Sequence, residues 1–120
     1  MRQRIFMKRK INIDRDNIRF YVNEEIQYKF HGKFINCILF NISESGVLLK
    51  TNQVFIKGDI INILINLENN FESLTLKAEV VHVNNQYIGL KFLHLTKNDI
   101  YLIREYISEK FNKKFNFYKG

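Results

Sequence analysis

The sequence has no proline and no tryptophan, and it contains a single cysteine. Without proline, no proline-rich linker divides the 120 residues, a length that suits one domain with its own core. Cys37 has no partner for an internal disulfide, and its apolar neighbours Ile35 and Leu39 predict a small buried side chain. Because a lone thiol fits a reducing compartment, we expect a cytoplasmic protein.

Long apolar segments are missing as well. No apolar run reaches the roughly 18 residues that a membrane span needs, and the basic start leads into no apolar segment of the signal-peptide type. We therefore expect no membrane span. Apolar residues still make up 46% of the chain, which predicts a folded domain rather than disorder.

Residue patterns for metal binding are absent from the sequence. His31, His82 and His94 are not spaced as metal ligands, and Cys37 has no second cysteine beside it. By alternation His82 falls on the apolar face of a predicted strand over residues 71–83, so we interpret it as a buried structural histidine. The sequence predicts neither a metal site nor a cofactor.

Catalytic motifs are absent too. The sequence contains no G-x-S-x-G segment and no glycine-rich loop of the Walker or dinucleotide-binding type. The adjacent carboxylates Glu24 and Glu25 should point to opposite faces of a strand, so they cannot act as a catalytic pair. We therefore expect a binding protein and not an enzyme.

Positive charge is concentrated at the two ends of the chain. The formal net charge is +7; residues 1–19 hold seven basic and two acidic side chains, and residues 110–120 hold four lysines and no acid. Basic ends favour a partner that carries phosphate groups. The lysines at the C-terminal end fit a role in solubility equally well.

Alternation of apolar and polar residues indicates short β-strands along most of the chain. From Phe20 to Phe30 the alternation is regular, with Glu24 as the exception on the apolar face. Five further strands are predicted between turn-forming residues, at 34–42, 47–49, 60–67, 71–83 and 87–93. Six antiparallel strands and a following helix predict a small closed barrel with the helix packed on it.

The predicted helix begins after the last strand. Thr96 can cap it, with Asp99 in the first turn. Three residues fall on one face at helical spacing: Ile100, Ile103 and Ile107. We expect the helix to end near Lys110.

These elements divide the chain into three parts. We expect a flexible basic arm at residues 1–14, a barrel domain with its helix at residues 15–110, and a basic aromatic tail at residues 111–120.

Two polar segments stand out from the strand pattern. The segment from Arg15 to Arg19 is an R-x-x-x-R just before the first strand, and the segment from Asn41 to Gly46 is an N-x-S-x-x-G between the second and third strands. The 26 residues from Arg15 to Asn41 hold one strand, a turn and a second strand. Because an antiparallel pair returns the chain to its start, the two segments are expected to face each other at one end of the barrel.

Together these segments resemble the PilZ family, which carries an R-x-x-x-R at the barrel entry and a D/N-x-S-x-x-G after the second strand. Residues 88–92, Ile-Gly-Leu-Lys-Phe, are a further match in the predicted last strand. The resemblance covers roughly residues 15–110. It implies a mainly β fold, a six-stranded antiparallel β-barrel with a C-terminal α-helix.

The resemblance also implies a function, which is to bind the bacterial second messenger cyclic di-GMP and to regulate a partner in motility, surface polysaccharide synthesis or gene expression. Arg15 and Arg19 would grip phosphates bidentately or stack on guanine. Asn41 and Ser43 would contact a guanine. Gly46 would permit a positive φ and leave no Cβ in the way.

The sequence departs from the family pattern at two positions. Asn41 stands where aspartate is commoner, and Asp14 stands where many members have an extra arginine. Members with that arginine tend to hold two stacked ligand molecules, so Asp14 predicts one cyclic di-GMP per chain. Arg9 and Lys10 are auxiliary candidates, since they could fold back and supply the missing charge.

Two other functions stay open at this stage. Small barrels with basic arms and exposed aromatic residues also bind single-stranded nucleic acid. A PilZ adaptor that works without ligand is a further alternative, although such members usually lack the arginines. The tail aromatics could also pack on a neighbouring domain, and the effector protein is not identified by the sequence.

Overall fold

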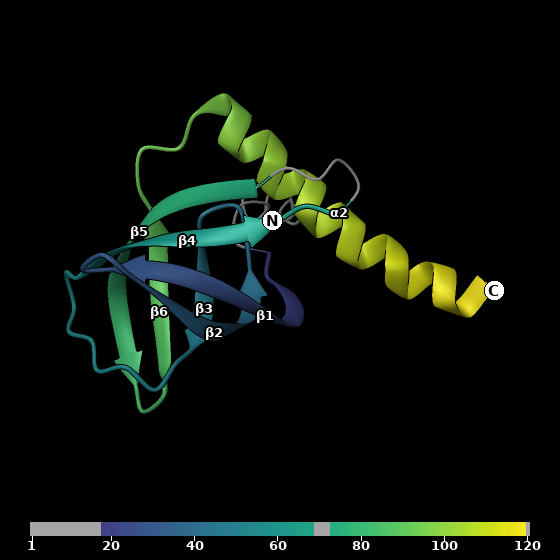
Figure 1. Ribbon diagram of the computed structural model, residues 1–120. Helices are drawn as coiled ribbons and strands as arrows, with labels where there is room; N and C mark the ends of the chain where they lie inside the picture. Colours follow the sequence, from purple (N-terminus) through teal and green to yellow (C-terminus); the bar gives the residue numbers. More distant parts are fainter. Residues whose placement is uncertain (1–17, 69–72, 120) are drawn as a thin grey trace, which may run out of the picture.

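The computed structural model describes residues 18–68 and 73–119, with side chains described as far as Phe111. Its elements, labelled as in Figure 1, are β1 (Phe20–Phe30), β2 (Lys33–Ile42), β3 (Gly46–Lys50), β4 (Ile60–Asn66), β5 (Ser73–Asn84), β6 (Tyr87–Phe92) and helix α2 (Lys97–Lys119). The predicted series of six strands followed by a helix is confirmed. The predicted arm at residues 1–14 lies outside the described residues.

The six strands form a closed barrel in the order β1-β2-β3-β6-β5-β4, and every neighbouring pair is antiparallel. The β1–β2 turn contains His31 and Gly32 with φ of 51° and 77°, the positive values that a tight two-residue hairpin requires. Asn85 in the β5–β6 turn has a φ of 57°, a positive value that asparagine tolerates better than most residues. Short turns of this kind keep β1 beside β2 and β5 beside β6, whereas β3 and β4 are consecutive in sequence but not adjacent in the barrel.

The barrel interior is filled by the apolar face of each strand. Alternate residues of β4 and β5 are buried, among them Ile61, Ile63, Leu74 and Leu76. Each such side chain contributes roughly 1.5–3 kcal/mol when it leaves water. One polar link crosses the core, where Tyr28 Oη lies 2.9 Å from Thr51 Oγ1.

Helix α2 begins with the predicted cap. The amide of Asp99 donates to Thr96 Oγ1 at 3.0 Å, and the amide of Thr96 donates to Asp99 Oδ2 at 3.0 Å, a reciprocal capping box. Ile103 is fully buried against the barrel. Figure 1 shows the helix packed along one end of the barrel and then extending away from it.

The predicted helix end near Lys110 is wrong, because α2 continues to Lys119. Residues 110–119 contain neither proline nor glycine, so nothing in the backbone terminates the helix there. Lysines in the last turns also suit the negative end of the helix dipole. The helix therefore includes residues 111–119 of the predicted tail.

His82 is exposed, and its predicted burial is wrong. The pairing of β5 with β6 shifts between Val80 and His82, which marks a β-bulge. An extra residue in one strand reverses the faces of the residues that follow it. His82 therefore leaves the buried face that Ala78 and Val80 occupy.

Cys37 is 5% exposed, as predicted, and burial raises its pKa to about 12, with a smaller contribution from the negative charge of Glu25. Because the thiolate is the reactive form, we expect alkylation of folded protein at pH 8 to be roughly a thousandfold slower than that of an unperturbed thiol. Mass spectrometry after iodoacetamide treatment tests this, with urea-unfolded protein as the control. Equal rates in both samples would contradict a buried, protonated thiol.

Candidate ligand-binding site

The loop from Asn41 to Gly46 is organised by the hydroxyl of Ser43. The amides of Ser45 and Gly46 each donate to Ser43 Oγ at 3.2 Å, and the amide of Ser43 donates to the carbonyl of Gly46 at 2.9 Å. Ser43 is fully buried. The hydroxyl therefore shapes the loop in this structure, and it could meet a ligand only after these bonds rearrange.

Gly46 is required by a close backbone contact and not by a positive φ. Among the glycines in the described ranges, positive φ occurs at Gly32 and Gly58. A Cβ on Gly46 would lie 2.1 Å from the carbonyl oxygen of Leu90 in β6. The expectation of a positive φ is thus wrong, and what a Cβ would meet here is the backbone of β6. The expected role of Gly46 toward a ligand stays a prediction.

One hydrogen bond joins the two sequence segments. Arg19 Nη1 donates to Asn41 Oδ1 at 2.8 Å, and Asn41 is 5% exposed while Arg19 lies at the surface. Because the amide of Asn41 is neutral, the bond orients the guanidinium without cancelling its charge. Arg15 and the candidates Arg9, Lys10 and Asp14 lie outside the described residues.

An aromatic row beside Arg19 was not identified from the sequence. The ring of Tyr21 meets Phe40 edge-on at 5.5 Å between centroids, and Phe40 meets Tyr87 at 5.6 Å. Lys50 Nζ lies 5.9 Å from the centre of the Tyr87 ring. Tyr21 is 66% exposed, so the row offers an exposed aromatic ring near cationic side chains. Its members come from three strands, which is why no local pattern marks it.

Helix α2 is held to the barrel by a cluster of charged groups. Lys110 Nζ lies 2.6 Å from Glu24 Oε2 and 3.1 Å from Glu68 Oε2, and the Tyr106 hydroxyl donates to Glu24 Oε1. Burial opposes the charge on Lys110, but its two carboxylate partners outweigh this and raise its pKa. Burial, assisted by the Glu24 carboxylate, raises the pKa of Tyr106 far above its usual range. Glu24 is thus a structural residue of the helix–barrel interface.

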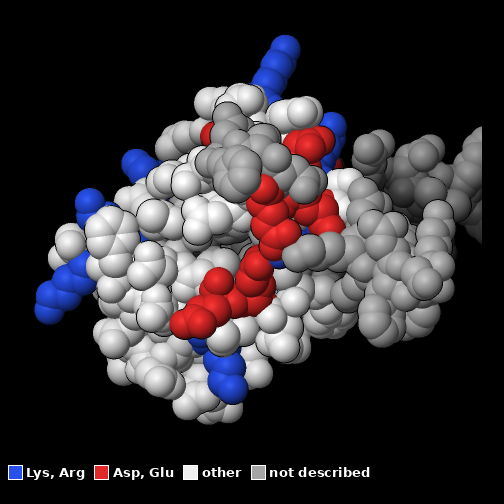
Figure 2. Space-filling model, turned by 45° about the vertical axis from the view of Figure 1, so that its right-hand side comes forward, with Lys and Arg blue, Asp and Glu red and all other residues white. Residues whose placement is uncertain are grey.

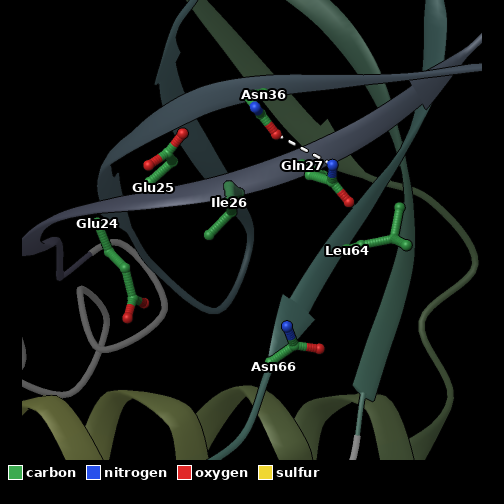
Figure 3. A pocket seen from close by; sticks show the side chains of 7 residues that line it. All are labelled: Glu24, Glu25, Ile26, Gln27, Asn36, Leu64 and Asn66. Carbon is green, nitrogen blue, oxygen red and sulfur yellow. Dashed lines mark hydrogen bonds between the residues drawn. The ribbon is translucent and has the colours of Figure 1, made fainter.

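Acidic side chains gather in a band across one face of the molecule, as Figure 2 shows. A pocket of about 320 Å³ lies on the barrel side between β1 and β4. Its lining comprises Glu24, Glu25, Ile26, Gln27, Asn36, Leu64 and Asn66. In Figure 3 the two glutamates point away from each other, as predicted for adjacent strand residues. The lining contains two carboxylates and no lysine or arginine, so this pocket does not suit a phosphate-bearing ligand.

Other kinds of site are not found in the part of the chain that the structure describes. No group of three His, Cys, Asp or Glu side chains there could hold a metal ion. None of the helical residues placed by the structure forms a segment both long and apolar enough to cross a membrane.

Comparisons with known proteins agree with this geometry. The family model described as PilZ domain matches residues 13–109. No curated protein sequence matches the chain. Among solved structures, the PilZ domain of CeSA from a cellulose-synthesizing bacterium is 14% identical with a TM-score of 0.62, and the match covers 81% of this chain and 98% of that one.

Two longer proteins contain a similar domain. The inhibitor of motility MotI/DgrA of Bacillus subtilis is 15% identical with a TM-score of 0.61, over 82% of this chain and 50% of that one. PlzA of Borreliella burgdorferi, solved in complex with c-di-GMP, is 14% identical with a TM-score of 0.58, over 84% of this chain and 44% of that one. The chain thus spans half or less of these two relatives. At such low identity they show the fold, and it is the family match over residues 13–109 that shows that the chain belongs to the PilZ domain family.

Proposed function

We propose that this chain is a cyclic di-GMP receptor whose site combines Arg15, Arg19, Asn41, Ser43 and Gly46. The main support for this proposal is the hydrogen bond of 2.8 Å between Arg19 and Asn41. It joins the R-x-x-x-R segment to the N-x-S-x-x-G segment at one end of the barrel. The ligand is supported by the PlzA relative, which was solved with c-di-GMP.

The chemistry of these side chains matches the ligand. Cyclic di-GMP carries two phosphates and two guanines. An arginine fork bonds phosphate oxygens in pairs and stacks on a base, which lysine does less well. Arg19 is already oriented by a neutral partner, so its charge is available to a phosphate. Ser43 would exchange its bonds within the loop for bonds to the ligand.

The receptor acts by changing conformation. Ligand binding draws the segment from Arg15 to Arg19 onto the barrel and alters the surface offered to a downstream protein. That protein belongs to motility, surface polysaccharide synthesis or gene expression, and the receptor works in the cytoplasm without a cofactor and without catalysis.

Isothermal titration of the purified chain with cyclic di-GMP tests the proposal. Saturable binding that depends on Arg19 is the expected result. A parallel titration with GMP and with cyclic di-AMP controls for general affinity to phosphates. No heat and no change in amide exchange with cyclic di-GMP at millimolar concentration would overturn the assignment.

A second candidate function is binding of single-stranded nucleic acid. It is favoured by the row of Tyr21, Phe40 and Tyr87 with Lys50 and Arg19 beside it, because bases stack on aromatic rings while cations meet the phosphates. A fluorescent oligonucleotide distinguishes the two candidates. Tight, salt-dependent oligonucleotide binding together with no response to cyclic di-GMP would favour this second function.

We expect a stoichiometry of one cyclic di-GMP per chain, for which Asp14 is responsible. A second stacked ligand doubles the phosphate charge, and a carboxylate a few ångströms away opposes it by about 1–4 kcal/mol at a protein surface. Asp14→Arg should shift the ratio toward two. Native mass spectrometry gives the ratio directly, and two ligands on the wild-type chain would show that Asp14 does not control it.

A further inference from the structure

The loop between β3 and β4, residues 51–59, lies on the side of the barrel away from helix α2, as Figure 1 shows. Its central residue, Phe55, is 4% exposed and belongs to the core. The centroid of the Phe55 ring lies 5.7 Å from that of Tyr28 and 4.9 Å from that of Phe30. Because Phe30 is the last residue of β1, the loop packs against the end of the β1–β2 hairpin as well as against the core.

Hydrogen bonds fix both ends of this loop. The amide of Thr51 donates to the carbonyl of Gln86, in the turn between β5 and β6, at 2.8 Å. The amide of Gly58 donates to the carbonyl of Val80 in β5, also at 2.8 Å. Since Phe55 is anchored between these two points, the loop holds its outward side chains in defined positions.

Apolar side chains are exposed on either side of the anchor. Val54 is 90% exposed and Ile56 is 68% exposed, because in an extended segment the neighbours of a buried residue point the opposite way. Among the described residues ten large apolar side chains are exposed, and six of them lie in this loop or in the strand ends next to it. These six are Phe34, Val54, Ile56, Ile60, Val81 and Val83. Single exposed apolar residues are ordinary on a protein surface, whereas their concentration at one end indicates a contact surface.

Positive charge gathers at the same end of the molecule. We call this end, which comprises residues 29–34, 50–60 and 79–87, the loop end. It contains four lysines and two acids, namely Lys29, Lys33, Lys50 and Lys57 with Asp59 and Glu79. By contrast, residues 20–109 as a whole hold eight basic and ten acidic side chains. Half of the basic residues in that stretch therefore belong to the end that exposes the apolar ones.

We propose that the loop end docks on a lipid surface that carries negative charge; the inference goes beyond the proposed function. Val54 and Ile56 enter the apolar region below the lipid headgroups. The exposed lysines Lys33 and Lys57 lie at the level of the lipid phosphates and are attracted to them.

The composition of the loop end suits a lipid surface better than a protein partner. Tryptophan and arginine, which carry much of the binding energy of protein interfaces, are absent from the loop end. Valine is uncommon among the dominant residues of such interfaces, and lysine is depleted from them. Valine and isoleucine do transfer favourably into a bilayer, and an anionic leaflet attracts lysine.

Docking by the loop end leaves the proposed ligand site accessible. Arg19 directly precedes β1, whereas the loop packs against Phe30 at the other end of that strand. A strand of 11 residues spans about 30 Å, so a change in the loop should leave the affinity for cyclic di-GMP unaltered.

Insertion is tested by Val54→Trp, because the sequence has no other tryptophan and the new side chain is the sole indole fluorophore. With vesicles of phosphatidylglycerol and phosphatidylcholine in equal parts, we expect its emission to shift to the blue and to be quenched by brominated acyl chains. Tyr101→Trp, at an exposed position of helix α2, is the matched control and should show neither effect. No shift in Val54→Trp, or the same shift in both variants, overturns the inference.

The contribution of the apolar pair is measured with the double variant Val54→Ser and Ile56→Ser, which keeps every charge of the chain. Its binding to the same vesicles in co-sedimentation should be about tenfold or more weaker, because the apolar side chains that insert are lost. Tyr101→Ser should bind as wild type. Wild-type binding by the double variant would assign the vesicle contact to the basic ends of the chain and overturn the inference. A mass by light scattering that is larger for the wild type than for the double variant, without lipid, would assign the loop to a second copy and overturn it as well.

These outcomes separate the inference from the proposed function. If the wild type binds cyclic di-GMP but its binding to vesicles does not depend on Val54 and Ile56, docking by the loop end alone is refuted. If the loop inserts into vesicles and cyclic di-GMP does not bind, the proposed receptor function alone is refuted.

Discussion

Gly46→Ala is expected to destabilise the fold by on the order of 3 kcal/mol, although it adds a single methyl group. The new Cβ would lie 2.1 Å from the carbonyl oxygen of Leu90 and 3.2 Å from Cα of Lys91. Both are backbone atoms of β6, and Gly46 pairs with Lys91 across the β3–β6 ladder. No side-chain rotation relieves such a contact, so the two strands must separate and the barrel loses part of its closure.

Thermal unfolding followed by circular dichroism measures this effect. At roughly 4 °C per kcal/mol for a domain of this size, the Tm of Gly46→Ala should fall by about 10 °C or more. Gly32→Ala is the matched control, because Gly32 has a φ of +77° but no atom within 4 Å of a Cβ. That variant carries backbone strain alone, about 1–2 kcal/mol. Equal Tm values for the two variants would show that the contact with Leu90 is not what demands glycine.

The same experiment clarifies how a motif glycine should be interpreted. From the sequence, Gly46 is a turn residue beside a ligand, and either a positive φ or a close approach would explain it. The structure assigns the close approach. Weaker ligand binding by Gly46→Ala would therefore report a distorted barrel, and it would not by itself demonstrate a ligand contact.

Alternation could predict most of the barrel because each strand buries one face. From Phe20 to Phe30 the predicted and observed strands coincide. Alternation gives the wrong face where the pairing of two strands shifts, as it does before His82 in β5. The extra residue of such a β-bulge is set by the pairing with the adjacent strand, so the sequence of the bulged strand does not reveal it. The end of the helix is also hard to predict, because residues 110–119 contain neither proline nor glycine and no local signal separates Lys110 from the end of α2 at Lys119.

Sequence spacing could predict that Arg19 and Asn41 meet, because one strand pair spans the distance between their segments. It could not predict the contact of Glu44 with Arg104, which are sixty residues apart and come together only when the helix packs on the barrel end. Charge spacing along a sequence indicates pairs within one helix, but not a pair between a loop and a helix sixty residues away. Long-range polar partners of the site are thus visible in the structure and not in the sequence.

Arg19→Ala is expected to weaken cyclic di-GMP binding about 30-fold or more. Removing one partner of a desolvated charged hydrogen bond costs about 2–5 kcal/mol, and each 1.4 kcal/mol is about a tenfold change in Kd. Arg19→Lys should recover part of the affinity, because the charge returns without the planar fork. Arg15→Ala should resemble Arg19→Ala, since both arginines belong to the same segment.

Loss of binding must be separated from loss of fold, because Arg19→Ala also removes the donor that Asn41 accepts from. Asn41 is 5% exposed, and an unpaired buried polar group costs about 1–3 kcal/mol. Titrations should therefore be made well below the Tm of each variant, with the folded fraction checked by circular dichroism. Lys77→Gln, on the exposed face of β5, removes one positive charge elsewhere and should bind as wild type. If Lys77→Gln weakens binding as much as Arg19→Ala, the effect of Arg19 is one of net charge. If folded Arg19→Ala keeps wild-type affinity, the two segments do not form the site.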